Sequence, residues 1–127
     1  MEKSNKWEDE ISVKVQKGID FLLKLSKKQR NKLLMLLKEV QAIQKSDLTT
    51  EQKTKEIKNT LWTKRSVSGK LLMGAFLGTI TGLIIFGTGG IGIAGLGGAI
   101  GVWGWFAGTA GGVLVSSIIQ NFEKKKN

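Results

Sequence analysis

The feature that most constrains this 127-residue sequence is a stretch of 49 residues, Leu71 to Ile119, that contains no Asp, Glu, Lys, Arg, Asn, Gln or His. The charged residues all lie in Met1 to Lys70 or in Glu123 to Lys126. An ordinary globular domain carries polar side chains throughout its surface. Because this stretch offers only Ser and Thr as polar side chains over 49 residues, the sequence favours a membrane protein.

The uncharged stretch is too long for a single membrane-spanning helix. As one helix it would measure about 74 Å, whereas the hydrocarbon core of a bilayer is about 30 Å thick. The densest turn signal inside it is Gly87 to Gly90. The sequence therefore predicts a helical hairpin, with arms over Leu71 to Phe86 and roughly Ile91 to Ile119.

Basic residues flank both outer ends of this predicted hairpin, whereas its turn is uncharged. The positive-inside rule then predicts a multi-pass protein of the inner (cytoplasmic) membrane with both termini in the cytoplasm. On this topology Trp62 lies near the cytoplasmic boundary and Trp103 nearer the far side. We expect contact with anionic lipid headgroups, at about 1 kcal/mol per cation. The flanking cations are Lys64, Arg65, Lys70, Lys124, Lys125 and Lys126.

Small residues recur at regular intervals along both arms. Their spacing is four residues in the first arm and alternates between four and three in the second, which is typical of close helix packing in lipid. The arms could pack on each other within one chain, or these faces could join copies into a homo-oligomer, which we favour. The positions are Gly74, Gly78, Gly82, Gly90, Ala94, Gly97, Gly101, Gly104, Gly108 and Gly111.

This pattern resembles the glycine-zipper hairpins of small bacterial membrane proteins and pore-forming toxins. A basic helical region followed by such a hairpin is also similar in layout to the membrane-acting effectors of bacterial toxin and antiphage defence modules. The resemblance covers about 40% of the chain. It implies oligomeric membrane insertion and identifies no individual functional residue.

The first 70 residues carry 17 basic and 9 acidic side chains and no proline. Apolar residues at intervals of three and four predict helices over residues 5–25 and from residue 27 to about 45. Ser26 with Gln29, and Thr49 with Gln52, have the spacing of capping boxes that open helices. We expect the helix after Thr49 to continue as a stalk into the apolar segment.

The apolar face of the second helix is a candidate docking surface for a protein partner and consists of Leu33, Leu36, Leu37 and Val40. Three interpretations of the basic region stay open, namely a helical bundle with a solvated face, a membrane-surface helix and a nucleic-acid binder. Nucleic acid is the least favoured partner. The lysines lack helix-turn-helix spacing, and Arg30 and Arg65 are the only arginines.

The composition argues against an enzyme. Without Cys or His, the chain has no thiolate or imidazole for a metal site and no histidine for catalysis. The glycine-rich residues 87–98 lack the Lys and the Ser or Thr of a phosphate-binding loop. We expect no catalytic residue, cofactor or metal.

The sequence therefore predicts an all-α protein, an integral membrane helical hairpin preceded by a basic amphipathic helical region. Its parts are a basic helical region (1–48), a juxtamembrane stalk (49–70), a two-span hairpin (71–119) and a basic tail (120–127). The favoured function is a self-oligomerising effector that permeabilises or depolarises a bacterial membrane. The alternatives are a membrane-anchored adaptor that binds a cytoplasmic partner through its N-terminal helices, and a holin-like or fusion-assisting phage protein.

Overall fold

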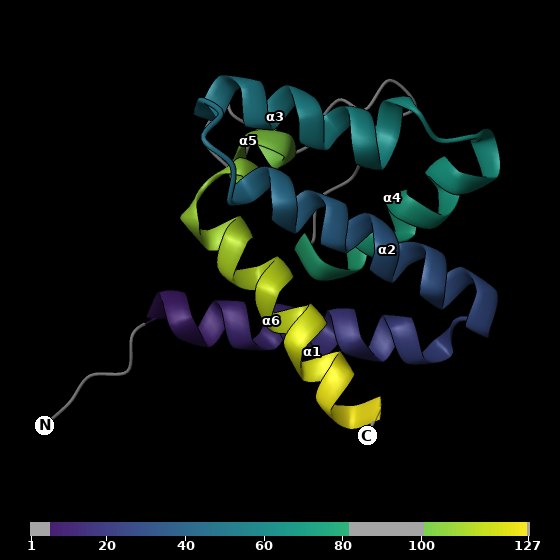
Figure 1. Ribbon diagram of the computed structural model, residues 1–127. Helices are drawn as coiled ribbons and strands as arrows, with labels where there is room; N and C mark the ends of the chain where they lie inside the picture. Colours follow the sequence, from purple (N-terminus) through teal and green to yellow (C-terminus); the bar gives the residue numbers. More distant parts are fainter. Residues whose placement is uncertain (1–5, 82–100, 127) are drawn as a thin grey trace, which may run out of the picture.

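The computed structural model describes residues 6–81 and 101–126, and Figure 1 shows their arrangement. Within these two ranges the secondary structure is helical and includes no strand. The all-α part of the prediction is confirmed. The elements are α1 (Lys6–Lys24), α2 (Lys27–Gln44), α3 (Thr50–Lys58), the π-helical turn η1 (Asn59–Thr63), α4 (Val67–Thr81), α5 (Gly101–Ala107) and α6 (Thr109–Lys126).

Both predicted capping motifs open helices in the structure. The Ser26 hydroxyl oxygen accepts a hydrogen bond from the Gln29 amide at 3.2 Å. At the start of α3 the Gln52 amide donates to the Thr49 hydroxyl at 3.1 Å, and the Thr49 amide donates to the Gln52 side-chain oxygen at 3.0 Å. These bonds use amide groups that have no partner inside the helix, so the two starts were readable from local sequence.

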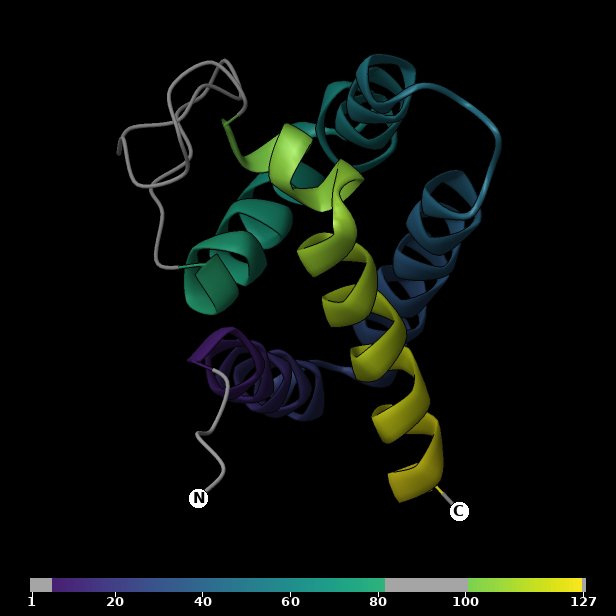
Figure 2. The same cartoon turned by 90° about the vertical axis from the view of Figure 1, so that its left-hand side faces the viewer.

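Helix α6 lies at the centre of the packing. It contacts α1, α2 and α5, and Figure 2 shows it with α1 and α4 on one side and α2 on the other. Its inner face includes Leu114, Val115 and Ile118, all buried. A Cβ atom on Gly18 of α1 would lie 2.7 Å from the Ile118 Cδ1 atom, so the absent side chain lets α1 and α6 approach closely.

The buried residues form one hydrophobic cluster that extends from α1 to α6. The Phe76 ring of α4 is fully buried and meets the Phe21 ring of α1 edge-on, with the ring centroids 5.5 Å apart. Helix α5 packs on α3, and Phe106 is fully buried there. The basic N-terminal helices and the described helices of the apolar segment thus share a core, in which α1 to α3 pack against α4, α5 and α6.

The predicted integral membrane hairpin is contradicted by this structure. Among residues 6–81 and 101–126, no helix combines the length and the apolar character needed to cross a membrane. The multi-pass inner-membrane location and the transmembrane and pore-forming interpretations were therefore wrong.

The positions of two tryptophans show how the helices pack instead. The hairpin topology placed Trp62 and Trp103 toward opposite sides of a bilayer. In the structure both are buried, and their ring centroids lie 6.2 Å apart. Apolar surface that the sequence assigned to lipid is covered here by side chains of the same chain.

The predicted stalk also ends earlier than expected. Helix α3 passes into the π-helical turn η1, in which the Lys64 amide donates to the Asn59 carbonyl oxygen at 3.1 Å. The wider turn accompanies the burial of Leu61 and Trp62 in the core. The chain then turns, and α4 begins at Val67 in a new direction (Figure 1).

A close approach of backbones joins α5 to α6. Helix α5 ends at Ala107 and α6 begins at Thr109, so the small residues around Gly108 do not lie on one continuous helix as their spacing suggested. A Cβ atom on Gly111 would lie 2.5 Å from the Trp105 carbonyl oxygen. Because that oxygen belongs to the backbone, a side chain at Gly111 would force α5 and α6 apart.

Two adjacent glycines provide a test of this junction. Gly111→Ala should lower the free energy of unfolding by about 1–3 kcal/mol, because the added methyl overlaps the α5 backbone. Gly112→Ala is the matched control, since its Cβ atom would meet nothing within 4 Å. It should leave stability unchanged or raise it by up to about 1 kcal/mol through helix propensity. Urea unfolding followed by tryptophan fluorescence measures both, and equal effects would contradict the junction as described.

Candidate functional site

The residues predicted to dock a protein partner lie inside the protein. Leu33, Leu36, Leu37 and Val40 are all buried on the inner face of α2. Helix α2 packs there against α6, α3 and η1 of the same chain. In this structure these leucines therefore hold α2 in place, and none of them presents an exposed apolar surface.

Leu33 and Leu36 also reach the floor of a small pocket between the start of α2 and the start of α4. This α2–α4 pocket has a volume of about 190 Å³. Its apolar part is completed by Leu72 and Met73 of α4. Apolar side chains from two helices thus line a recess at the edge of the core.

Three cations surround this apolar recess. Lys28 and Lys32 come from the first turns of α2, and Arg65 comes from the turn before α4. Among the residues that the structure describes, no acidic side chain lines this pocket. The fold therefore combines a positive rim with an apolar floor, a combination that suits an anionic amphiphile.

Arg65, which lines this pocket, has a hydrogen-bond donor that lacks an acceptor. Within the part of the chain that the structure describes, its Nε atom is buried and has no hydrogen-bond partner. The side chain lies against the first turn of α4, where a Cβ atom on Gly69 would come within 3.2 Å of the Arg65 Cβ atom. A buried donor without an acceptor costs about 1–3 kcal/mol, and a bound anion would remove that cost.

The backbone of α4 adds positive potential at the same place. Ser66 caps the helix by accepting a hydrogen bond from the Gly69 amide at 3.1 Å, and the Lys70 amide donates to the Ser66 carbonyl oxygen at 2.8 Å. The amino end of a helix carries a partial positive charge. Since Ser68 and Gly69 line the α2–α4 pocket, this charge reinforces the lysines and Arg65.

Two large apolar side chains beside the pocket are turned toward solvent. Val67 is 78% exposed and Leu71 is 71% exposed, the highest values among the large hydrophobic residues that the structure describes. They lie one turn apart on the same side of α4. Each directly precedes a residue that lines the pocket, Ser68 or Leu72. An exposed apolar pair beside a cationic pocket is typical of a surface that meets lipid or a partner.

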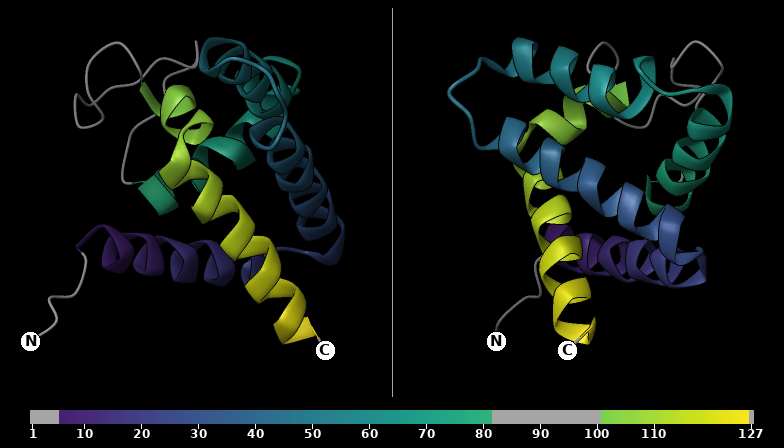
Figure 3. Two further views of the ribbon diagram at one scale, coloured as in Figure 1. Left: turned by 60° about the vertical axis from the view of Figure 1, so that its left-hand side comes forward. Right: turned by 45° about the vertical axis from the view of Figure 1, so that its right-hand side comes forward.

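The six predicted headgroup cations are not brought together. Lys64 is exposed next to Arg65, whereas the Lys70 Nζ atom lies 5.8 Å from the centre of the Trp62 ring. Lys124 lies in the last turns of α6, away from the start of α4 (Figure 3). There the neighbouring Glu123 pairs with Lys38 at 2.9 Å. The side chains of Lys125 and Lys126 lie outside the described part of the chain.

The predicted small-residue positions have several different surroundings. Gly82, Gly90, Ala94 and Gly97 lie outside the described residues. Gly101 begins α5, Gly104 is buried, Gly108 is exposed, and Gly111 touches the α5 backbone. Gly78 is half-buried, and a Cβ atom on Gly74 would lie 3.8 Å from the Trp62 ring. Within the described ranges, the packing contacts of Gly74 and Gly111 are made inside one chain.

The sequence predicted a cationic site at Lys64, Arg65 and Lys70 but not its convergence with lysines of α2. Lys28 and Arg65 are far apart in the chain, and no local pattern indicates that the starts of α2 and α4 line one pocket. The sequence also placed Leu71 at the start of a membrane span, whereas the structure exposes this side chain to solvent. The cationic character was predictable, but the pocket needed the tertiary fold.

The other arginine has a purely structural environment. The Arg30 Nε atom donates to the Leu22 carbonyl oxygen at 3.1 Å, and its terminal nitrogen donates to the Leu25 carbonyl oxygen at 3.0 Å. These carbonyl groups belong to the end of α1, where a cation is favourable. Arg30 therefore holds the end of α1 against α2 through two of its nitrogen atoms.

No metal centre is indicated, because the residues that the structure describes contain no group of three acidic side chains placed to hold a metal ion. Comparison with protein-family models, curated proteins and solved structures finds no significant match.

The two arginines should respond differently to the same substitution. Arg30→Met should lower the free energy of unfolding by about 1–3 kcal/mol, because two carbonyl oxygens lose a charged donor. Arg65→Met should leave the free energy of unfolding within about 1 kcal/mol of the parent or raise it, because it removes a buried donor without an acceptor. Thermal and urea unfolding measure both. A larger loss for Arg65→Met than for Arg30→Met would show that Arg65 serves the fold and not a ligand.

Proposed function

We propose that this protein binds acidic phospholipid at a lipid–water boundary through the start of α4, without a helix that crosses the bilayer. The observation that carries the proposal is the exposed pair Val67 and Leu71 beside a pocket with a cationic rim and an apolar floor. In this arrangement α4 meets the lipid at its amino end and α2 supplies part of the charge.

Charge provides the first part of the interaction. The chain has a formal net charge of +10, and Lys28, Lys32 and Arg65 face a common recess. A basic side chain near an anionic membrane surface contributes about 1 kcal/mol. Three such groups and exposed Lys64 give an attraction that depends on acidic lipid and weakens with salt.

Apolar contact provides the second part. Interfacial segments place their apolar side chains about 5–10 Å into the boundary between headgroups and acyl chains. Val67 and Leu71 are available for this, because they are largely free of contact with the rest of the chain. The apolar floor around Leu36 and Leu72 could then receive part of an acyl chain.

This combination supports lipid over nucleic acid. A phosphate backbone would also satisfy the lysines, but it would leave Val67 and Leu71 exposed to water and the apolar floor unused. Nucleic-acid surfaces commonly use several arginines or stacked aromatic rings. Here one of the two arginines is engaged at the end of α1, and Trp62 is buried.

The three functions suggested by the sequence all depended on the predicted hairpin. Permeabilisation by a self-assembled hairpin, anchoring of an adaptor and holin-like action each used two membrane spans. Contact with anionic lipid does not, so it is the part retained in this proposal. Homo-oligomerisation and a protein partner stay predictions.

A vesicle-binding experiment tests the charged part. The full chain should co-sediment with vesicles of phosphatidylglycerol and phosphatidylcholine and bind pure phosphatidylcholine little. Combining Lys28→Gln with Lys32→Gln should weaken binding by about 30-fold, corresponding to roughly 2 kcal/mol. Lys17→Gln, an exposed lysine of α1, is the single-site control and should have a much smaller effect. Binding that ignores salt, or none to acidic vesicles, would overturn the proposal.

A second pair of variants tests the apolar part. Combining Val67→Ser with Leu71→Ser should weaken vesicle binding by about tenfold or more, because two side chains lose burial in the interface. Val13→Ser is the matched control on α1, where the parent side chain is 54% exposed. It should bind vesicles like the parent. If the double variant and Val13→Ser bind vesicles equally well, the start of α4 is not the contact surface.

A further inference from the structure

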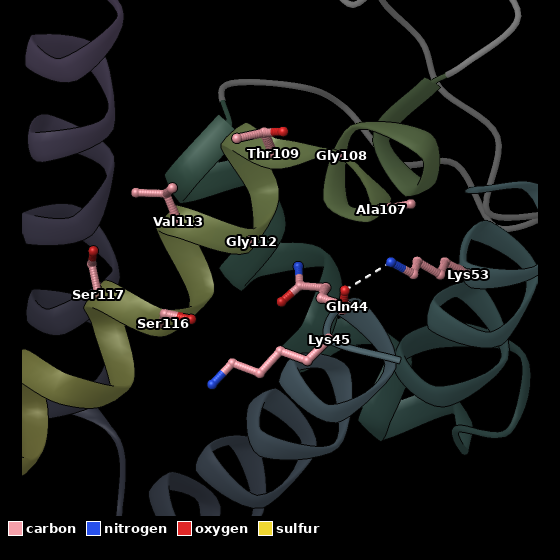
Figure 4. A pocket seen from close by; sticks show the side chains of 10 residues that line it. All are labelled: Gln44, Lys45, Lys53, Ala107, Gly108, Thr109, Gly112, Val113, Ser116 and Ser117. Atoms are coloured by element: carbon pink, nitrogen blue, oxygen red, sulfur yellow. Dashed lines mark hydrogen bonds between the residues drawn. The ribbon is translucent and has the colours of Figure 1, made fainter. Parts of the chain in front are cut away.

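A second, larger pocket lies at the opposite end of α2 from the α2–α4 pocket. Gln44 of α2, Lys45 directly after it, Lys53 of α3 and the first turns of α6 line an open pocket of about 480 Å³, shown in Figure 4. We call it the α2–α6 pocket. Lys28 lies in the first turn of α2 and Lys45 directly follows its last residue, so the two pockets are separated by about 25 Å along this helix.

The orientation of the Gln44 amide in this pocket is fixed. Its Nε2 atom donates to the Phe106 carbonyl oxygen at 2.6 Å. A carbonyl oxygen can only accept, so the amide cannot be rotated to exchange its two ends without losing this bond. The Gln44 backbone is held too, because its carbonyl oxygen accepts from the Lys53 Nζ atom at 2.8 Å.

This fixed orientation leaves an acceptor unsatisfied. The Gln44 Oε1 atom is buried and has no hydrogen-bond partner in the described part of the chain. Neighbouring Ser116 already accepts a hydrogen bond from the Gln41 side chain at 3.0 Å, so its own hydroxyl hydrogen can be donated to a ligand. The pocket therefore offers one acceptor that needs a donor and one hydroxyl that can serve an acceptor.

Positive charge accompanies these groups. Lys45 and Lys53 line the pocket, and no acidic side chain of residues 10–80 or 102–124 does so. Figure 4 shows the Lys45 side chain extending from α2 toward the wall of α6 that carries Ser116 and Ser117. On that wall a Cβ atom at Gly112 would meet nothing within 4 Å, so the space beside the helix is open.

We infer that the α2–α6 pocket binds a small phosphorylated polyol. A polyol hydroxyl would donate to the Gln44 Oε1 atom, and the phosphate would accept from Lys45 and from the serine hydroxyls of α6. Neither half of such a ligand satisfies the pocket alone. A plain anion would leave the Gln44 oxygen without a donor, and an uncharged polyol would leave the lysines without a counter-charge.

Isothermal titration of the full chain with glycerol 3-phosphate tests this inference. Glycerol 3-phosphate should bind, whereas glycerol and inorganic phosphate should each bind at least about tenfold more weakly. Absence of heat with glycerol 3-phosphate overturns the inference. Inorganic phosphate that binds equally well also overturns it, because the Gln44 acceptor would then have no role.

Two lysine variants locate the binding. Lys45→Gln should weaken glycerol 3-phosphate binding by about tenfold, since it removes a charged donor. Lys55→Gln, an exposed lysine of α3 that does not line the pocket, is the control and should bind like the parent. Equal binding by the parent and Lys45→Gln would place the ligand elsewhere and contradict the inference.

The source of the ligand and its independence from the vesicle contact are also measurable. Monomeric dihexanoyl phosphatidylglycerol carries the same chemistry as a lipid headgroup, so tighter binding than glycerol 3-phosphate indicates a lipid and weaker binding indicates a free metabolite. Lys45→Gln should leave binding to acidic vesicles unchanged, and the Lys28 and Lys32 substitutions should leave glycerol 3-phosphate binding unchanged. Parallel loss of both activities in every variant would show one shared site and overturn the assignment of two.

Discussion

The packing of the largely apolar helices α4, α5 and α6 against the apolar faces of the charged helices is the interaction on which the rest of the structure depends. Phe76, Phe106 and Ile118 of the uncharged segment have almost no exposed surface, and each such burial contributes about 1.5–3 kcal/mol. The amphipathic helices α1, α2 and α3 supply the opposing surface. Both pockets follow from this arrangement, because each forms where an end of α2 meets the uncharged helices at the edge of the core.

The starts of α2 and α3 could be predicted because their capping bonds join residues three positions apart. The failure of the hairpin prediction has an equally clear cause. Apolar composition shows that side chains avoid water, but it does not show whether lipid or other helices cover them. The leucine face of α2 is one such cover, and the pairing of Trp62 with Trp103 is a contact that only the tertiary fold creates. The convergence of Lys28 with Arg65 was beyond sequence reasoning for the same reason.

The structure separates the polar side chains that serve the fold from those without a partner among the described residues. Thr79 donates to the Ala75 carbonyl oxygen of its own helix, and Arg30 holds the end of α1. By contrast, the buried atoms Arg65 Nε and Gln44 Oε1 have no partner among the described residues. One is a donor among cations and the other is an acceptor beside lysines, so the two pockets require ligands of different chemistry.

The π-helical turn η1 contains a wider repeat than the α-helix that leads into it. This turn determines the direction in which the chain leaves α3 toward α4. Loss of a single residue there would allow α3 to continue as a regular helix and would rotate the following residues by about 100° about its axis. Arg65 would then leave the helix in another direction. The number of residues in η1 therefore matters as much as their identity. It determines where Arg65 lies and so whether the α2–α4 pocket forms.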